Sequence, residues 1–194
     1  MAVKHYEAPA FNRKEALRYA GVKESSPQME ALLDECITLA EGCWQYRVCW
    51  EEYPVIQTGN ELDLGFAKIT SDALMVNLRD CDRIVLFAAT VGFGIDRLIS
   101  RYRTVSPSRA HMLQALGAER VESLCDAFEA EIHRTLGSTR PRFSPGFGDV
   151  PLTLQKDVFR ALHCTKHIGI TLGESLLMAP SKSVTAIIGI RRNT

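Results

Sequence analysis

The sequence lacks several features that would assign the protein to a large class. No apolar run reaches the roughly 18 residues that a membrane span requires, and the first residues, MAVKHYE, lack the apolar core of a signal peptide. Basic and acidic residues number 23 each, so no excess of positive charge favours nucleic acid or an anionic membrane surface. We therefore expect a cytoplasmic protein with no nucleic-acid or membrane partner.

Familiar catalytic and metal-binding signatures are also missing. No GxSxG, HExxH, Walker or kinase pattern occurs, and no histidine has a recognisable nucleophile partner. The six cysteines contain no CxxC pair and are typical of small buried hydrophobes. His163 and His167 lie four residues apart, but no third ligand follows at a useful spacing. The sequence therefore predicts no catalytic residue of its own and no metal site.

A Gly-x-Gly segment follows the clearest predicted strand. Residues 83–90 form a short, continuous apolar run typical of a buried strand, and Gly92, Gly94 and a helical pattern come next. A dinucleotide-binding loop would need a third glycine, but Arg97 occupies that position. We therefore favour a plain strand-to-helix turn over a nucleotide-binding loop.

Helical and extended patterns alternate along a chain long enough for one domain with a sizeable core. We predict a single domain over residues 1–194, with a helical N-terminal lobe over 1–44 and an α+β body over 45–194. Apolar spacing predicts helices after Asn12, after Ser26, after Ser71 or Asp72, from about Ser108 to His133 and from Leu154 to Leu162. Extended segments are predicted at 46–53, 54–56, 62–66, 83–90, 168–170 and 184–190. The fold class is α+β, with an antiparallel or mixed sheet covered by helices.

The most informative stretch is the loop over residues 140–151, in which prolines and glycines are too dense for a helix or a ladder strand. Arg142 offers a planar, permanently charged fork for a carboxylate, Gly146 permits close backbone approach, and Phe147 offers an apolar face for an adenine or an aliphatic group. The acids of the preceding helix are expected to form mostly a solvated face: Glu119, Glu122, Asp126, Glu129 and Glu131. One of them near the C-terminal half would point to the loop and complement a cationic group. This set suits a zwitterion such as an amino acid derivative; the alternative is an ordinary linker with solvated charges.

The segment from Arg142 to Phe147, RFSPGF, resembles the RxxxGY motif of the activation domain of cobalamin-dependent methionine synthase. Residues 168–175 and 178–184 resemble that domain's TGxxLTES…M.P..SVSG segment. Residues 124–128, together with His133, resemble a helix of the family that carries an acidic ligand-binding residue. By position that residue is Asp126. The similarity runs in order from Leu124 to Val184. It implies a stand-alone form of this activation domain, with a twisted antiparallel or mixed sheet.

The resemblance implies a role in methionine biosynthesis. In that family the domain binds S-adenosylmethionine, the methyl donor for reductive remethylation of cob(II)alamin, with an electron donor such as flavodoxin. Because no DxHxxG motif is present, cobalamin would be reached only through a partner, a corrinoid methionine synthase or related methyltransferase. Arg142 would contact the ligand carboxylate and Asp126 its amino or sulfonium region. The cofactor-binding residues implied are Asp126, Arg142, Pro145, Gly146, Phe147 and Asp149.

Two departures from the family pattern keep an alternative open. Phe147 stands where the motif has tyrosine, and the sequence ends at Thr194 before a segment that carries another tyrosine in the family. The alternative is a non-catalytic module that binds a corrinoid protein and has lost S-adenosylmethionine. A free-standing methyltransferase is less favoured, because no Rossmann glycine loop is complete.

Overall fold

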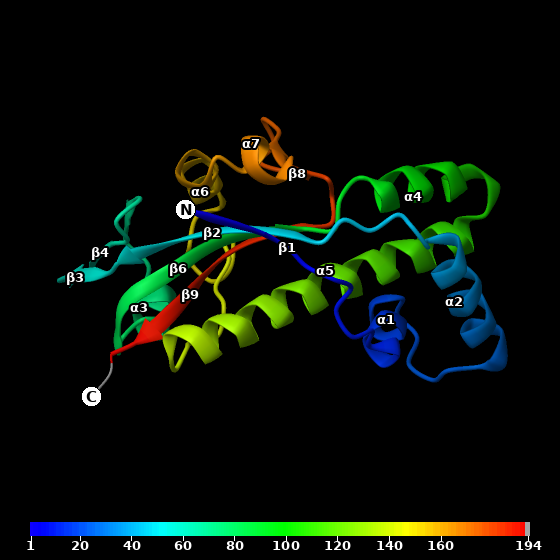
Figure 1. The fold of residues 1–194 in the computed structure, drawn as a ribbon, viewed down its shortest axis with the longest axis horizontal. Helices are drawn as coiled ribbons and strands as arrows, with labels where there is room; N and C mark the ends of the chain where they lie inside the picture. Colours follow the sequence, from blue (N-terminus) through cyan, green and yellow to red (C-terminus); the bar gives the residue numbers. More distant parts are fainter. Residues whose placement is uncertain (193–194) are drawn as a thin grey trace.

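A four-stranded antiparallel sheet forms the centre of the computed structural model, which describes residues 1–192. Helix α5 (Pro107–Leu136) runs below this sheet, whereas α6 (Gln155–Leu162) and α7 (Cys164–Ile168) lie above it (Figure 1). In spatial order the strands are β1 (Ala2–His5), β2 (Arg47–Pro54), β6 (Cys81–Thr90) and β9 (Ser183–Arg191). The predicted α+β class is confirmed.

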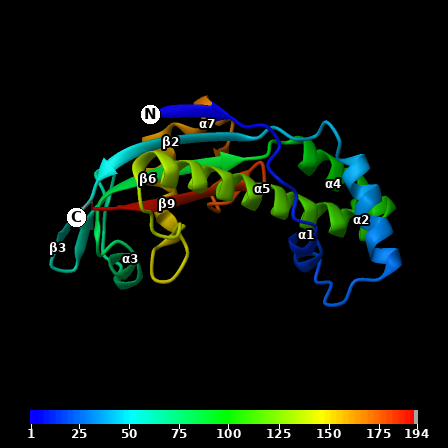
Figure 2. The ribbon, with the colours of Figure 1, turned by 60° about the horizontal axis from the view of Figure 1, so that its bottom comes forward.

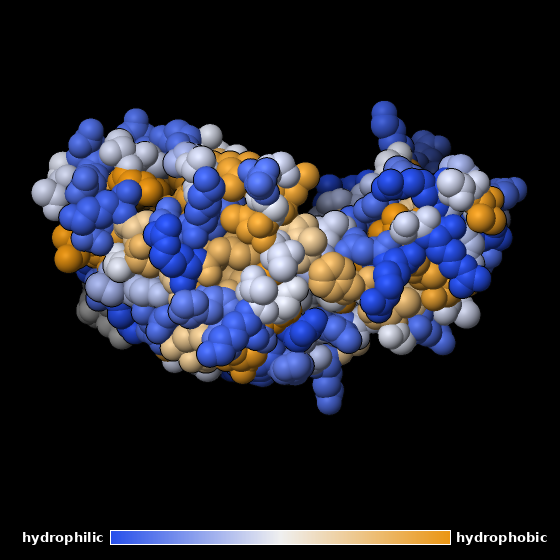
Figure 3. All heavy atoms as spheres, turned by 90° about the horizontal axis from the view of Figure 1, so that it is seen from above, coloured by the Kyte–Doolittle hydropathy of each residue, from blue (hydrophilic) through white to orange (hydrophobic). Residues whose placement is uncertain are grey.

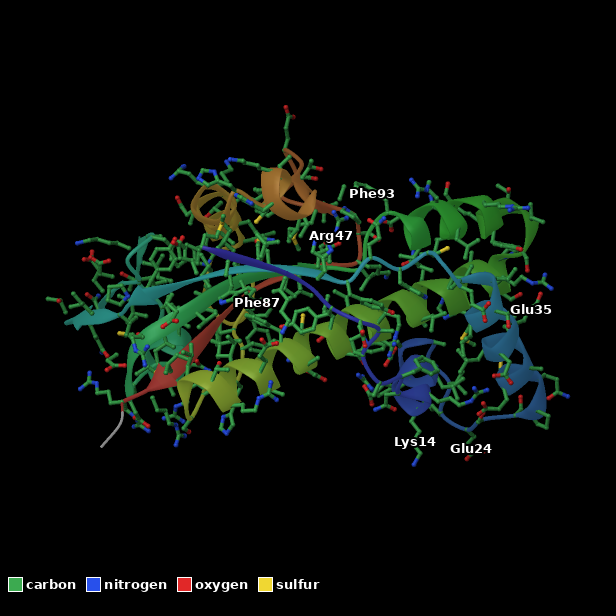
Figure 4. The ribbon with its side chains drawn as sticks, in the orientation of Figure 1. Lys14, Glu24, Glu35, Arg47, Phe87 and Phe93 are labelled. Carbon is green, nitrogen blue, oxygen red and sulfur yellow. The ribbon has the colours of Figure 1, made fainter. Side chains whose placement is uncertain are left out.

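The sheet separates two apolar cores, because successive side chains of a strand point to opposite faces. On β6, Val85, Phe87 and Ala89 enter the core on the α5 side, and Ile84, Leu86 and Ala88 enter the other core. Phe87 lies between β6 and α5 (Figure 4), where its ring centroid is 4.9 Å from that of Phe128. Burial on both faces explains why this strand is a continuous apolar run in the sequence.

A helical end extends beyond the sheet, where α1 (Arg13–Tyr19), α2 (Pro27–Leu39) and α4 (Gly94–Val105) gather around one end of α5 (Figure 2). The first two helices begin as predicted. The Asn12 side chain accepts a hydrogen bond from Glu15 N at 3.2 Å, and the Ser26 side chain accepts one from Met29 N at 3.3 Å. Seen from above, the surface is hollowed between this end and the body that carries the sheet (Figure 3).

Short elements lie outside the central sheet. Of the two predicted caps of α3 (Asp72–Asn77), Ser71 is the one that accepts from Leu74 N, at 3.0 Å. The others are β3 (Ile56–Thr58), β4 (Glu61–Asp63), β5 (Lys68–Ile69), the 3-10 helix η1 (Leu152–Leu154), β7 (Thr171–Leu172) and β8 (Met178–Ala179).

Two sequence-based expectations about secondary structure are wrong. The segment before residue 44 is not wholly helical, because β1 pairs antiparallel with β2, with Ala2 opposite Trp50 and His5 opposite Arg47. Four residues carry too little alternation to predict a strand whose partner is distant in the sequence. Residues 168–170 are not a strand. Ile168 ends α7, and Gly169, at φ +74°, terminates that helix in a left-handed conformation.

The Gly-x-Gly turn has a packing role. A Cβ at Gly94 would lie 2.1 Å from the backbone oxygen of Cys43, so only glycine lets α4 begin this close to the preceding chain. The plain strand-to-helix turn fits this contact.

Candidate functional site

The loop after α5 returns along β9, and this pairing aims Arg142. Phe143 N donates to Ile187 O at 2.8 Å, Ile187 N donates to Phe143 O at 2.9 Å, and Arg140 N donates to Gly189 O at 2.8 Å. In extended chain, neighbouring side chains point to opposite sides. Phe143 is buried in the core opposite α5, and Arg142 is directed to α5.

Three carboxylates of α5 receive the Arg142 guanidinium. Nη1 donates to Asp126 Oδ1 and to Glu129 Oε2, both at 2.7 Å, and Nη2 donates to Glu122 Oε2 at 2.6 Å. Residues three and four apart share one face of a helix, so these acids converge on one point. The structure thus brings together Arg142 and Asp126, the two residues predicted to hold the charged groups of a ligand.

This cluster carries more negative than positive charge. Three carboxylates against one guanidinium leave an excess of two negative charges when all are ionised. Burial lowers the pKa of Arg142, but the hydrogen bonds to Asp126, Glu122 and Glu129 outweigh it and the pKa is raised, so the guanidinium stays charged. The Asp126 side chain is 68% exposed and is therefore the most accessible of the three carboxylates for an incoming cation.

Two adjoining cavities, of about 220 and 640 Å³, flank the cluster and share Asn12, Ser123 and Asp126. The smaller is lined by Asn12, Glu15, Tyr19, Glu119, Glu122, Ser123, Asp126 and Arg142. The larger is lined by Pro9, Ala10, Phe11, Asn12, Arg13, Lys14, Ser123, Asp126 and Ala127. Together they form a cleft between α5 and the segment 9–19, which we call the α5 cleft.

A buried ion pair holds the opposite wall of the α5 cleft. Glu119 is 1% exposed, and its Oε2 accepts from Arg120 Nε at 2.6 Å. Arg120 Nη1 donates to Pro9 O at 2.9 Å and Nη2 to Ala10 O at 3.0 Å, while Asn12 N donates to Glu119 Oε1 at 2.8 Å. We call this arrangement the Glu119–Arg120 latch, because it ties residues 9–12 to α5.

Sequence reasoning missed the latch and assigned Glu119 to a solvated helix face. That assignment is wrong, because the segment 9–12 covers the helix there and supplies backbone partners. Helical spacing alone does not reveal which polar positions a distant segment will cover. One sequence signal is that two adjacent charged residues, Glu119 and Arg120, stand between apolar residues of α5.

The remaining loop residues lie outside both linings among the residues that the structure describes. Phe147 is 67% exposed and meets Phe143 edge-on, with ring centroids 5.3 Å apart. Gly146, at φ +86°, has its N–H donating to Val150 O at 3.0 Å, and Pro145 is buried. Ligand contact by Pro145, Gly146 and Phe147 stays a prediction.

Asp149 ties the loop to the first turn of α3. Its carboxylate accepts from the Ser71 hydroxyl, from Asp72 N at 2.7 Å and from Ala73 N at 3.3 Å. The Ser71 hydrogen bond and these backbone donors lower the pKa of Asp149. Since the carboxylate already serves α3, we leave Asp149 out of the site that we propose below.

The histidine pair and the cysteines form no metal or disulfide site in the residues that the structure describes. The His163 and His167 ring centroids are 6.4 Å apart, and within residues 1–192 no three His, Cys, Asp or Glu side chains are grouped to hold a metal ion. All six cysteines are free thiols. Over the same residues, no helix combines the length and apolar character needed to cross a membrane.

Comparison with known proteins defines the class of fold. No protein-family model matches the chain, and no curated protein matches it by sequence. A crystal structure of the MetH reactivation domain bound to AdoHcy matches with a TM-score of 0.76 and 15% identity, over 100% of this chain and 80% of the other. At that identity the match establishes the fold. The chain has the α+β fold of the methionine synthase reactivation domain, as the sequence resemblance implied.

Proposed function

We propose that the protein binds S-adenosylmethionine in the α5 cleft and serves reductive remethylation of a partner's cob(II)alamin. The partner would be a cobalamin-dependent methionine synthase or related corrinoid methyltransferase. The observation that carries this proposal is the convergence of Arg142 and Asp126 on one cleft in a chain with the reactivation-domain fold. The matching solved structure was bound to AdoHcy, an adenosyl amino acid of the same class.

The charges of the α5 cleft fit this ligand. S-adenosylmethionine carries an ammonium, a sulfonium and a carboxylate, so two cationic groups meet the two excess negative charges of the cluster. Carboxylates that pair with the ligand's cations bind Arg142 less strongly. The Arg142 guanidinium can then donate hydrogen bonds to the ligand carboxylate. Arg142 and Asp126 therefore bind and orient the ligand; they do not transfer the methyl group.

Bound S-adenosylmethionine would supply the methyl group, and the partner's corrinoid, reduced by a donor such as flavodoxin, would accept it. Arg142, Asp126, Glu122 and Glu129 would hold the amino acid end, leaving the methyl-bearing sulfonium to the open side of the cleft. The exposure of Asp126 supports this orientation. A dry, enclosed pocket is not needed here, since the acceptor must approach from outside the chain.

The direct test is calorimetric titration with S-adenosylmethionine. We expect Arg142→Ala to weaken binding at least tenfold, since a charged hydrogen bond contributes about 1.5–3 kcal/mol. Arg160→Ala is the matched control, because Arg160 pairs with Asp157 at 2.9 Å on α6, away from the α5 cleft. Thermal unfolding of both variants shows whether weaker binding reflects a lost ligand contact or loss of the folded state. Absence of binding by the wild type contradicts the proposal.

A second candidate function is a corrinoid-protein interaction module without a ligand. The observation that favours it is that both terminal nitrogens of Arg142 are already paired with carboxylates, while Phe147 lacks the hydroxyl of the motif tyrosine. Co-purification with a corrinoid methyltransferase, together with a silent titration, would favour this function over the first.

A further inference from the structure

Phe11 stands in the wall of the α5 cleft as a half-exposed aromatic side chain on a fixed backbone. The ring lines the larger cavity and is 38% exposed. The Arg120 guanidinium lies 4.9 Å from the ring centroid. Arg120 thus covers one part of the ring, and the rest faces the cleft. A flat aromatic surface backed by a cation is suited to stacking of a planar base.

We propose that Phe11 is a stacking platform for the purine base of an adenosyl ligand, and that the Glu119–Arg120 latch positions it. This inference rests on the proposed function, which concerns the charged end of the same ligand in the same cleft. It assigns the opposite end of the ligand to a segment that the motif resemblance does not include, since the resemblance begins at Leu124.

The latch determines the place of the ring. The carbonyls on the N-terminal side of Phe11 accept from Arg120, and the amide that follows it, of Asn12, donates to Glu119. The Asn12 side chain also caps α1. Because the backbone is held on both sides of residue 11, stacking would cost little ordering of the segment.

The α5 cleft is long enough for the two ends of an elongated ligand to lie against different residues. Its floor on α5 extends from Glu119 to Ala127, which at 1.5 Å per residue is about 12 Å of helix. The Arg142 cluster lies against the smaller cavity and Phe11 against the larger, and Asp126 borders both. An elongated ligand with a charged end and a flat end matches this order.

The test is titration of Phe11→Ala and Phe11→Trp with two probes, S-adenosylmethionine and adenosine. We expect Phe11→Ala to weaken the binding of both probes roughly tenfold, in the range found for removal of a base-stacking aromatic. Phe11→Trp should keep or strengthen both. Phe93→Ala is the matched control, because Phe93 is 40% exposed and lies at the start of α4, outside the α5 cleft (Figure 4).

The outcomes distinguish this inference from the proposed function. Arg142→Ala should weaken S-adenosylmethionine but leave adenosine unchanged, since adenosine lacks the amino acid end. If Phe11→Ala and Phe11→Trp bind both probes as the wild type does while Arg142→Ala loses S-adenosylmethionine, the platform is overturned and the proposed function stands. A wild type that binds neither probe overturns both.

Discussion

The Arg142 guanidinium and the Asp126 carboxylate are joined by a hydrogen bond of 2.7 Å between Nη1 and Oδ1, across the turn that ends α5. The bond exists because the loop pairs with β9 and brings Arg142 back onto the helix that it has just left. A linker with solvated charges would show no such convergence. The same residues explain both how the loop is anchored and how a zwitterion would be held.

Asp126→Asn tests the cation-binding side of this pair. An amide cannot neutralise the ligand's ammonium or sulfonium, so we expect the S-adenosylmethionine affinity to fall about tenfold, or roughly 1.4 kcal/mol. Stability should change little, because the side chain is 68% exposed. Calorimetry at two salt concentrations checks the result, since screening should shrink the difference. The control Asp157→Asn on α6 should bind as the wild type; equal losses in both variants would contradict a specific role.

Glu119→Ala should destabilise the fold strongly. It leaves the Arg120 guanidinium buried without its charge partner, a change that typically costs about 3–5 kcal/mol. Urea unfolding measures this loss. The control is Glu35→Ala, which removes a bond of the same kind to Arg109, at 2.7 Å between Nε and Oε1, but on the surface. A free energy of unfolding equal in the two variants would show that the latch is not needed for stability.

Asp149→Asn tests how the loop is fixed to α3. The folded-state pKa of Asp149 is lowered, so ionisation stabilises the fold above the unfolded pKa of about 3.9, and this contribution is lost as the pH falls through the lower folded value. We expect the stability difference between wild type and variant to shrink below about pH 4. Urea unfolding from pH 6 to pH 3 measures it, and Ser71→Ala should reduce the same pH dependence. A constant difference over this range would refute the assignment.

Gly94→Ala tests whether the Gly-x-Gly turn is a packing feature. A Cβ there would lie 2.1 Å from Cys43 O, so the backbone must shift, and we expect a loss of at least about 2 kcal/mol in unfolding free energy. Gly173→Ala is the matched control, because the nearest atom to its Cβ would be at 3.5 Å, an ordinary contact. Thermal and urea unfolding compare the two. A tolerated Gly94→Ala would remove the steric explanation for this glycine.

Much of the local structure was predictable, because short-range physics determines it. The apolar run at residues 83–90 lies within β6, the helical spacing after Pro107 lies within α5, and Asn12 and Ser71 cap the helices that they were expected to cap. Predictions failed where a distant partner decides the state. The strand β1 exists through pairing with β2, and Glu119 is buried because residues 9–12 cover it.

The candidate site divides in the same way. Sequence patterns alone predicted a guanidinium on a stiff loop and acids at helical spacing, since charge and periodicity are properties of the chain. The tertiary structure brings three of those acids to Arg142, pairs Asp149 with the first turn of α3, and places Phe11 in the cleft. These contacts depend on sheet pairing and on the hydrogen bonds that Glu119 and Arg120 make to residues 9–12, more than 100 residues away in the sequence, which no local pattern records.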